Sequence, residues 1–139
     1  MTRELLGRYK QNRRELSLID RQLVRLEGRL EEVETVSGKV SKTSDDWPYI
    51  EEHMTVRMAE PRAATAIKDK IREKKARRKK IQGEIWQVEK FIKGLPEGIE
   101  RQILEMVYLE EMSQRDTAEM TGYTQSMVSK IIKGAVKDS

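Results

Sequence analysis

Cysteine is absent from the 139-residue sequence, which excludes disulfide bonds, zinc-thiolate sites and cysteine nucleophiles. Aromatic residues make up only 5% of the chain and there are three prolines, a composition that disfavours a β-sandwich or β-barrel. No apolar run approaches the roughly 20 residues of a membrane-spanning helix. Glycine-rich phosphate loops, metal-ligand sets and a nucleophile with a base partner are also lacking. These absences predict a cytoplasmic, all-α protein that is not an enzyme and has no cofactor.

Charge, by contrast, is abundant and unevenly distributed. Charged residues make up 37% of the chain, and the formal net charge is +4. Residues 68–80 hold nine basic residues against Asp69 and Glu73. Such a run is either a contact surface for polyanions or a solvated helix face, and charge runs in general favour the solvated face.

Two stretches of the chain have apolar residues at alternating steps of four and three, the spacing of a heptad helix. They cover residues 5–33 and 64–95. Asn12 is the only polar residue in the first row, and Lys74 and Arg78 interrupt the second. The spacing predicts two long helices, each with one apolar seam.

Two heptad helices of similar length that are joined by a hairpin-sized connection are most simply an antiparallel pair. We therefore predict a coiled-coil hairpin, or stalk, at residues 1–93, in which each apolar seam buries the other. With the two seams aligned, Asp20 approaches Lys74 or Arg78. Thr2 is the expected N-cap of the first helix.

Turn-forming residues collect between the two helical stretches, at about residues 35–60. Apolar and polar residues alternate at residues 54–58, and residues 36–42 offer an opposing strand. This inserted segment is predicted to be a loop or a short β-hairpin, with the aromatic residues of Trp47-Pro48-Tyr49 packed against the helices. Pro61 suits the first turn of the second helix.

The last part of the chain, residues 94–139, has the spacing of three short helices. A helix to about Leu109 is followed by Ser113, a predicted N-cap of the second helix. Gly122 would supply a left-handed turn, and Thr124 would cap the third helix. The pattern predicts a helix-turn-helix headpiece on the stalk.

The third helix of the headpiece presents polar and basic side chains and no carboxylate. Glutamine can bond adenine with two hydrogen bonds, serine and lysine can reach base edges, and lysine can meet phosphates. A helical hairpin used for protein contacts is the alternative, but the tight turn and the capped helices favour double-stranded DNA. The candidate DNA-contacting residues are Arg115, Thr124, Gln125, Ser126, Ser129, Lys130, Lys133 and Lys137.

The headpiece contains a set of residues at the spacing of a known family: Leu95, Pro96, Tyr108, Glu110, Ser113, Ala118, Gly122, Val128 and Ser129. With these residues it resembles region four of bacterial sigma factors and related phage-encoded regulators, in which three helices bind promoter DNA. Thr117 and Thr121 stand where that family has large aliphatic residues, which implies either looser packing or a partly divergent site. The order of the stalk, the Trp47-Pro48-Tyr49 turn and the basic residues 74–80 is similar to the ArpU/RinA-like phage group. The resemblance implies a regulator of phage or mobile-element genes.

We therefore predict a sequence-specific transcription regulator that binds double-stranded DNA and no membrane. Two other functions stay open: a coiled-coil interaction or scaffold protein, and a phage terminase small subunit. The acidic residues of the headpiece either contact RNA polymerase or only solvate the surface, and solvation is favoured. These residues are Glu97, Glu100, Glu105, Glu110 and Glu111.

Several apolar residues flank the seams of the stalk and would stay exposed in a single hairpin. Pairing two stalks would bury them and would give two recognition helices a two-fold axis. The sequence therefore predicts a homodimer, and the alternative is a monomer whose β-hairpin folds back over the stalk. The flanking residues are Leu6, Leu18, Val24, Trp86 and Phe91.

Overall fold

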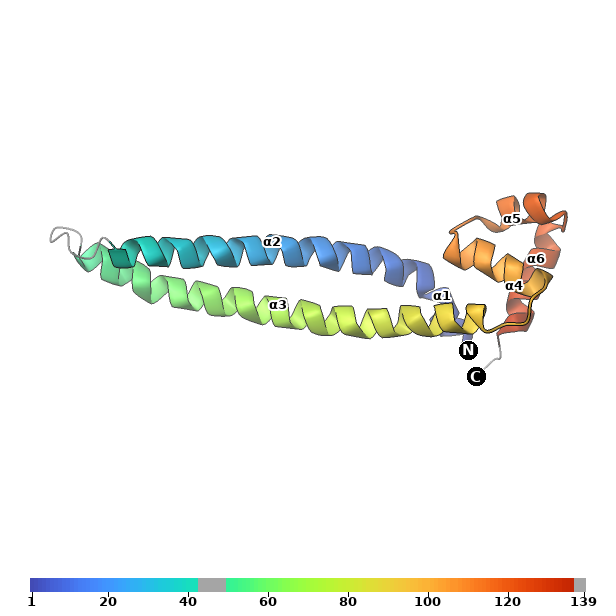
Figure 1. Ribbon diagram of the computed structural model, residues 1–139, viewed down its shortest axis with the longest axis horizontal. Helices are drawn as coiled ribbons and strands as arrows, with labels where there is room; N and C mark the ends of the chain where they lie inside the picture. Colours follow the sequence, from blue (N-terminus) through green and yellow to red (C-terminus); the bar gives the residue numbers. More distant parts are fainter. Residues whose placement is uncertain (43–49, 137–139) are drawn as a thin grey trace. The chain divides into compact units, whose positions relative to one another are not determined.

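Every secondary-structure element that the structure describes is helical (Figure 1). The computed structural model describes residues 1–42 and 50–136, with side chains for residues 1–35 and 62–136. The predicted all-α class is confirmed. Within these ranges no helix is both long and apolar enough to cross a lipid bilayer. The elements are α1 (Arg3–Gly7), α2 (Tyr9–Lys42), α3 (Ile50–Lys93), α4 (Ile99–Leu104), the π-helical segment η2 (Glu105–Leu109), α5 (Gln114–Thr121) and α6 (Gln125–Ala135).

The β-hairpin predicted between the long helices is wrong for the residues that the structure describes. Residues 36–42 belong to α2 and residues 54–58 belong to α3. Val33, Val36 and Val40 are three and four residues apart, so the apolar spacing of the first helix continues through the predicted strand. A short alternation of apolar and polar residues is compatible with a strand and with a helix, and here both segments are helical.

Pro61 lies inside α3 and does not begin the helix, since α3 starts at Ile50. Proline removes one main-chain hydrogen bond from a helix but keeps the helical φ angle. A long helix can therefore continue through it at a local cost of about 3 kcal/mol. The predicted turn Trp47-Pro48-Tyr49 lies outside the described residues.

The chain divides into two compact units, each of which contains part of α2 and part of α3. We name Met1–Leu16 together with Lys80–Ser139 the head unit, and Ser17–Lys79 the hairpin unit.

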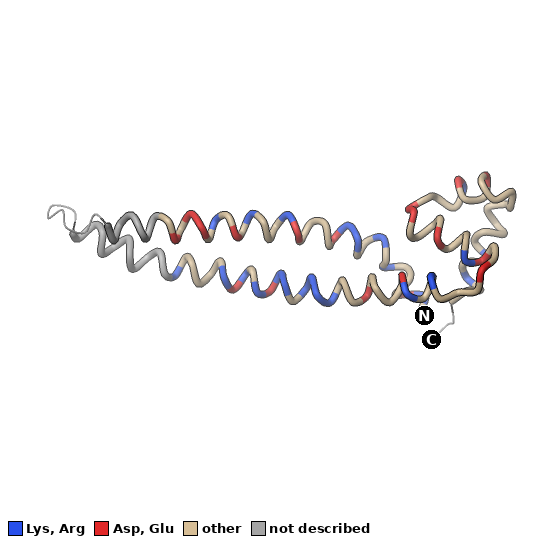
Figure 2. The backbone as a smooth tube through the Cα atoms, viewed as in Figure 1, with Lys and Arg blue, Asp and Glu red and all other residues tan. Residues whose placement is uncertain are grey.

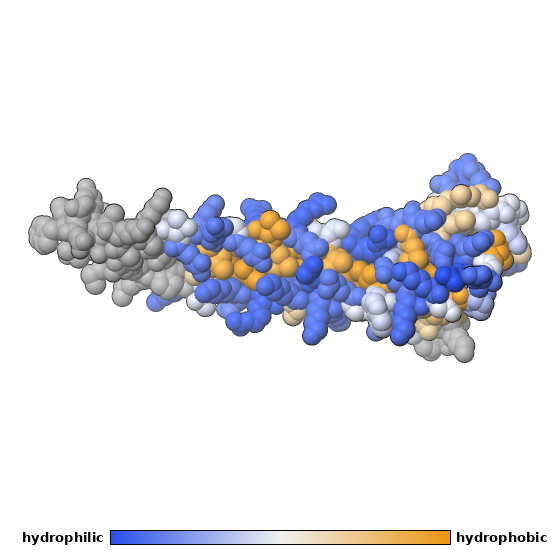
Figure 3. Space-filling view, viewed as in Figure 1, coloured by the Kyte–Doolittle hydropathy of each residue, from blue (hydrophilic) through white to orange (hydrophobic). Residues whose placement is uncertain are grey.

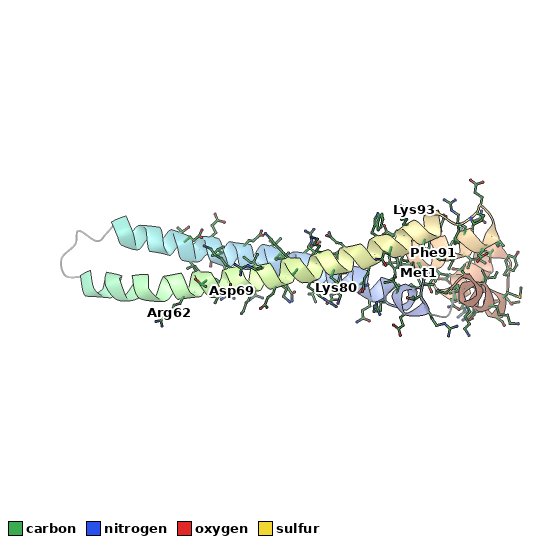
Figure 4. All side chains as sticks on the ribbon, turned by 90° about the horizontal axis from the view of Figure 1, so that it is seen from below. Met1, Arg62, Asp69, Lys80, Phe91 and Lys93 are labelled. Atoms are coloured by element: carbon green, nitrogen blue, oxygen red, sulfur yellow. The ribbon has the colours of Figure 1, made fainter. Side chains whose placement is uncertain are left out.

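In the hairpin unit, α2 and α3 lie side by side and run in opposite directions (Figures 1 and 4). Figure 3 shows apolar residues along the line where the two helices meet, with hydrophilic residues on both sides. Arg78 Nε lies 2.7 Å from Asp20 Oδ1, and Lys68 Nζ lies 3.9 Å from Glu34 Oε1. The expected approach of Asp20 to Arg78 is therefore confirmed. The buried seam residues here are Ile19, Leu23, Ile67 and Ile71.

The head unit begins with a short helix that changes the phase of the predicted seam. The Thr2 hydroxyl accepts a hydrogen bond from the Leu5 N–H, so the expected cap is confirmed. However, α1 ends at Gly7 and α2 begins at Tyr9. Because of this break Leu6, which was expected on the exposed flank, is only 2% exposed.

Asn12, the polar residue in the first seam, is buried and has a partner on the opposite helix. Its Nδ2 donates to Glu84 Oε2 at 2.7 Å, and Arg8 Nη2 donates to Glu84 Oε1 at 3.2 Å. The hydrogen bond from Asn12, followed by the bond and charge of Arg8, holds the pKa of Glu84 below its usual value despite partial burial. A polar pair within an apolar seam specifies the register, since any other register would leave its members unpaired.

The start of α2 also packs against the headpiece helices. The rings of Tyr9 and Tyr108 meet edge to face at 6.3 Å between centroids, and burial raises the pKa of Tyr108. Arg13 Nη1 donates to the Leu109 carbonyl at 3.2 Å, which satisfies an acceptor at the end of η2. The headpiece core therefore extends to residues at the beginning of the sequence.

Tyr9 provides a pH test of this packing. Burial, and then the hydrogen bond and charge of Glu89, raise the pKa of Tyr9 from 10.0 to about 12. Because the raised pKa belongs to the folded state, the stability that Tyr9 contributes is full below pH 10 and is lost as the pH rises toward 12. We expect the free energy of unfolding of Tyr9→Phe, measured with denaturant, to lie below that of the wild type at neutral pH.

The difference in free energy of unfolding between the wild type and Tyr9→Phe should then decrease as the pH rises from 10 toward 12. Tyr123→Phe is the control, because Tyr123 is 38% exposed and no described hydrogen bond involves its hydroxyl. A gap that stays constant or widens with rising pH would contradict this interpretation.

Candidate DNA-binding site

The site is built on α5, a three-residue turn and α6, and local capping sets its geometry. Ser113 Oγ accepts from the Asp116 N–H at 3.0 Å, and Thr124 Oγ1 accepts from the Met127 N–H at 3.2 Å. Gly122 is left-handed, with φ 81° and ψ 4°, and its N–H donates to the Ala118 carbonyl at 2.9 Å. Both predicted caps and the predicted left-handed turn are confirmed.

The buried face of the headpiece holds α6 against α4 and α5. Val128 on α6 is 0% exposed, as are Ile103 and Leu104 on α4. Ala118, which is 7% exposed, has a side chain small enough to let α5 approach α6 closely. This packing orients α6, so that residues off its apolar stripe face outward.

Thr117 occupies a position where an aliphatic residue was expected, and it is fully buried. Its hydroxyl donates to the Ser113 carbonyl at 2.8 Å, and the Thr121 hydroxyl donates to the Thr117 carbonyl at 2.8 Å. Each hydroxyl thus bonds a carbonyl one helical turn back, a pattern that threonine adopts inside helices. The two threonines therefore leave no unpaired donor in α5.

The structure brings most of the predicted DNA-contacting residues of α6 together on one face. Ser126, Ser129, Lys130 and Lys133 follow one another at steps of three, one and three, opposite Val128. Ser129 is half-buried and the other three are exposed. Their convergence produces a polar and basic surface that could enter a groove of DNA.

The remaining predicted residues lie around this face. Gln125 is exposed at the first turn of α6, and Thr124 is exposed with its hydroxyl engaged in the cap. The Arg115 side chain is 79% exposed on α5, with Nε 3.8 Å from Glu119 Oε1. Lys137 lies outside the described residues.

Two apolar residues beside the polar face were missed by the sequence analysis. Met127 is 43% exposed and Tyr123 is 38% exposed. Both adjoin the N-terminal turn of α6, where an apolar group can contact a thymine methyl. The signal was available in part: Val128 and Ile132 define the buried stripe, and Met127 falls outside it.

Among the described residues of the headpiece, the uncompensated positive charge lies on α6. Arg101 Nε lies 2.8 Å from Glu105 Oε1, and Arg115 pairs with Glu119, so both arginines are compensated. The sequence of α6, in contrast, contains Lys130 and Lys133 and no carboxylate. The N-terminal end of a helix adds a partial positive charge that favours phosphate.

The comparisons with known proteins agree with this geometry. Residues 92–138 match the family described as Sigma-70, region 4. That region is a DNA-binding domain of the helix-turn-helix type, and α5, the turn and α6 have the helix-turn-helix arrangement. The predicted resemblance is confirmed for this part of the chain, while the resemblance to the ArpU/RinA-like phage group stays a prediction. Neither the curated proteins nor the solved structures contain a match to the chain.

Gly122 allows a test of the turn that sets the angle between α5 and α6. A Cβ at Gly122 would meet nothing within 4 Å, so the cost of Gly122→Ala arises from the left-handed backbone alone. We expect the free energy of unfolding to fall by about 1 to 2 kcal/mol, measured by denaturant titration.

Gly134→Ala is the matched control. A Cβ there also meets nothing within 4 Å, but Gly134 lies inside α6 with helical backbone. This substitution should raise stability by up to about 1 kcal/mol. Equal effects of the two substitutions would show that the left-handed turn has no energetic role.

Proposed function

We propose that this protein is a sequence-specific transcription regulator that reads double-stranded DNA with α6. The observation that carries the proposal is the outward face of α6, which is polar, basic and free of carboxylates in a helix-turn-helix domain. In this class of domain the second helix of the motif lies in the major groove. The protein would thus act in the cytoplasm by binding, without catalysing a reaction.

The side chains on and around α6 divide into two kinds of contact. Gln125, Ser126 and Ser129 have the donors and acceptors that discriminate bases. Lys130 and Lys133 can neutralise phosphates, which positions the protein without specifying sequence. The candidate residues that flank these two groups are Arg115, Thr124 and Lys137.

We further propose that the regulated genes belong to a phage or mobile element. The support is the order of basic helical stalk and C-terminal headpiece, which is similar to phage-encoded regulators of the ArpU/RinA-like group. A terminase small subunit would also bind DNA through a helix-turn-helix, but it would assemble as a ring. A scaffold protein without DNA contact would leave the carboxylate-free face of α6 unexplained.

RNA polymerase is a second candidate partner, supported by the similarity to a sigma-factor region. Among the acidic residues proposed for that contact, Glu105 pairs with Arg101 and Glu111 pairs with Arg13. These pairs reduce the charge available to a partner. The polymerase contact is therefore supported less strongly than the DNA contact.

We also propose that the protein is a homodimer. Leu18, Val24 and Trp86 are 52%, 72% and 59% exposed, so the single chain leaves these apolar side chains in water. In the head unit, Trp86 also lines a hollow of about 500 Å³ together with Met1 and Phe91, which lie close together in Figure 4. A second copy of the chain would cover these residues, and two-fold symmetry would match a palindromic operator.

The DNA-binding proposal predicts two different kinds of defect. Gln125→Ala or Ser129→Ala should relax sequence preference, since each base contact is worth about 1 to 3 kcal/mol. Lys133→Ala should weaken binding to all sequences alike and reduce the salt slope by about one. Selection of bound duplexes from a random pool, followed by fluorescence anisotropy at several salt concentrations, measures both effects. Salt-independent or undetectable binding of the wild type at low ionic strength would refute the proposal.

The dimer proposal predicts a mass by light scattering of twice the 16.3 kDa chain value at micromolar concentration. Trp86→Glu should shift the mass toward the monomer, because a charge would have to be buried in the interface. Met120→Glu is the control, since Met120 is 69% exposed on α5 and does not line the hollow. A wild-type mass near 16.3 kDa, unchanged by a palindromic duplex, excludes the dimer.

A further inference from the structure

The hairpin unit contains a basic groove between α2 and α3 that the proposed function does not use. The groove has a volume of about 410 Å³. Among its lining residues, Glu73 is the only carboxylate, and four are cationic. Figure 2 shows the concentration of lysine and arginine on this part of α3. The groove is lined by Gln22, Arg25, Leu26 and Arg29 from α2 and by Lys70, Glu73 and Lys74 from α3.

The groove exists because Lys74 occupies a position of the apolar seam. An apolar side chain there would be buried in the seam, as Ile71 is one step earlier. Lys74 is instead half-buried, and Leu26 beside it is half-buried too. A lysine at such a position extends its stem along apolar surface and keeps its ammonium group in water. The sequence irregularity thus produces both the hollow and one of its charges.

The cations of the groove are arranged in two matching pairs. Arg25 and Arg29 are four residues apart on α2, and Lys70 and Lys74 are four residues apart on α3. Four residues span about 6 Å along a helix, so each pair lies on one face. Phosphates of one DNA strand recur at about 3.4 Å along the helix axis. Two such steps, about 7 Å, are close to the roughly 6 Å between the two cations of each pair.

Ion pairs compensate several cations of the hairpin unit that lie outside the groove. Outside the groove, Arg78 pairs with Asp20 and Lys68 pairs with Glu34 across the two helices. None of the four groove cations forms an ion pair with a residue that the structure describes. Their positive charge is therefore concentrated on one side and available to an anion.

We propose that this groove, formed by Arg25, Arg29, Lys70 and Lys74, binds the phosphate backbone of double-stranded DNA without sequence preference. The choice of DNA as the polyanion rests on the proposed function. The headpiece supplies few cations for such binding, because its arginines at 101 and 115 are paired with glutamates. Non-specific affinity depends on the number of phosphates neutralised, so a second set of unpaired cations would supply what the headpiece lacks.

The experiment compares two variants of the full chain that lose equal charge. The groove variant carries Arg25→Gln, Arg29→Gln, Lys70→Gln and Lys74→Gln. The control carries Arg21→Gln, Arg62→Gln, Lys75→Gln and Lys79→Gln, four exposed cations of the hairpin unit that do not line the groove and that also form no ion pair with a described residue. Thermal unfolding by circular dichroism verifies that both variants fold. Fluorescence anisotropy with a duplex of random sequence then gives affinity as a function of salt.

We expect the slope of log affinity against log salt to decrease by about three to four in the groove variant. The control should keep a slope close to that of the wild type. An unchanged slope in the groove variant, or an equal loss in both variants, overturns the proposal. Loss of binding to phosphatidylserine vesicles with an unchanged DNA slope would also overturn it and would assign the groove to a membrane surface.

A failure of the groove proposal can be distinguished from a failure of the proposed base reading by α6. Gln125→Ala is assayed in parallel with the selected duplex and the random duplex. In one case Gln125→Ala retains full sequence preference and the groove variant shows a reduced salt slope. The proposal that α6 reads bases is then wrong, and the proposal that the groove binds DNA is supported. If Gln125→Ala relaxes the preference and the groove variant keeps its slope, the groove proposal alone fails.

Discussion

The hydrogen bond from Asn12 to Glu84 is the constraint on which the head unit depends. It is 2.7 Å long, lies in an otherwise apolar seam, and would be lost in any shifted pairing of α2 and α3. Only in this register does the Tyr9 hydroxyl donate to Glu89, at 2.9 Å. The same register brings Arg13 to the carbonyl of Leu109. One buried amide thus determines which part of the N-terminal helix meets the headpiece.

In the headpiece, local hydrogen bonds and non-local burial determine different aspects of the position of α6. Ser113, Gly122 and Thr124 set where α5 ends and where α6 begins, through bonds to residues within four positions. These bonds determine the direction of the chain but not which face of α6 is exposed. Burial of Val128 and Ile132 against α4 decides the face, because an apolar stripe can be removed from water in only one orientation.

Lysine at a seam position has a different consequence from asparagine at a seam position. Asn12 is 4% exposed and bonded to a carboxylate, so it adds specificity to the pairing. Lys74 has no carboxylate partner among the described residues, is half-buried, and opens a hollow beside Leu26. The difference is physical: a short amide can be satisfied within the seam, whereas an ammonium on a long stem must reach water.

Periodicity and local capping could be read from the sequence alone. The rows of apolar residues gave two long helices and their register, as Asp20 opposite Arg78 confirms, and the residues at 113, 122 and 124 gave the helix-turn-helix. Tertiary structure decided the rest. Residues 54–58, whose apolar alternation predicted a strand, lie in a helix. Leu6 is buried next to the helix break at Arg8, and the ring of Tyr9 packs against that of Tyr108. Helical spacing and capping act within about one or two turns of the chain, and the sequence displays them directly. A contact between residues almost a hundred positions apart depends on where both helices have been placed, which no local pattern encodes.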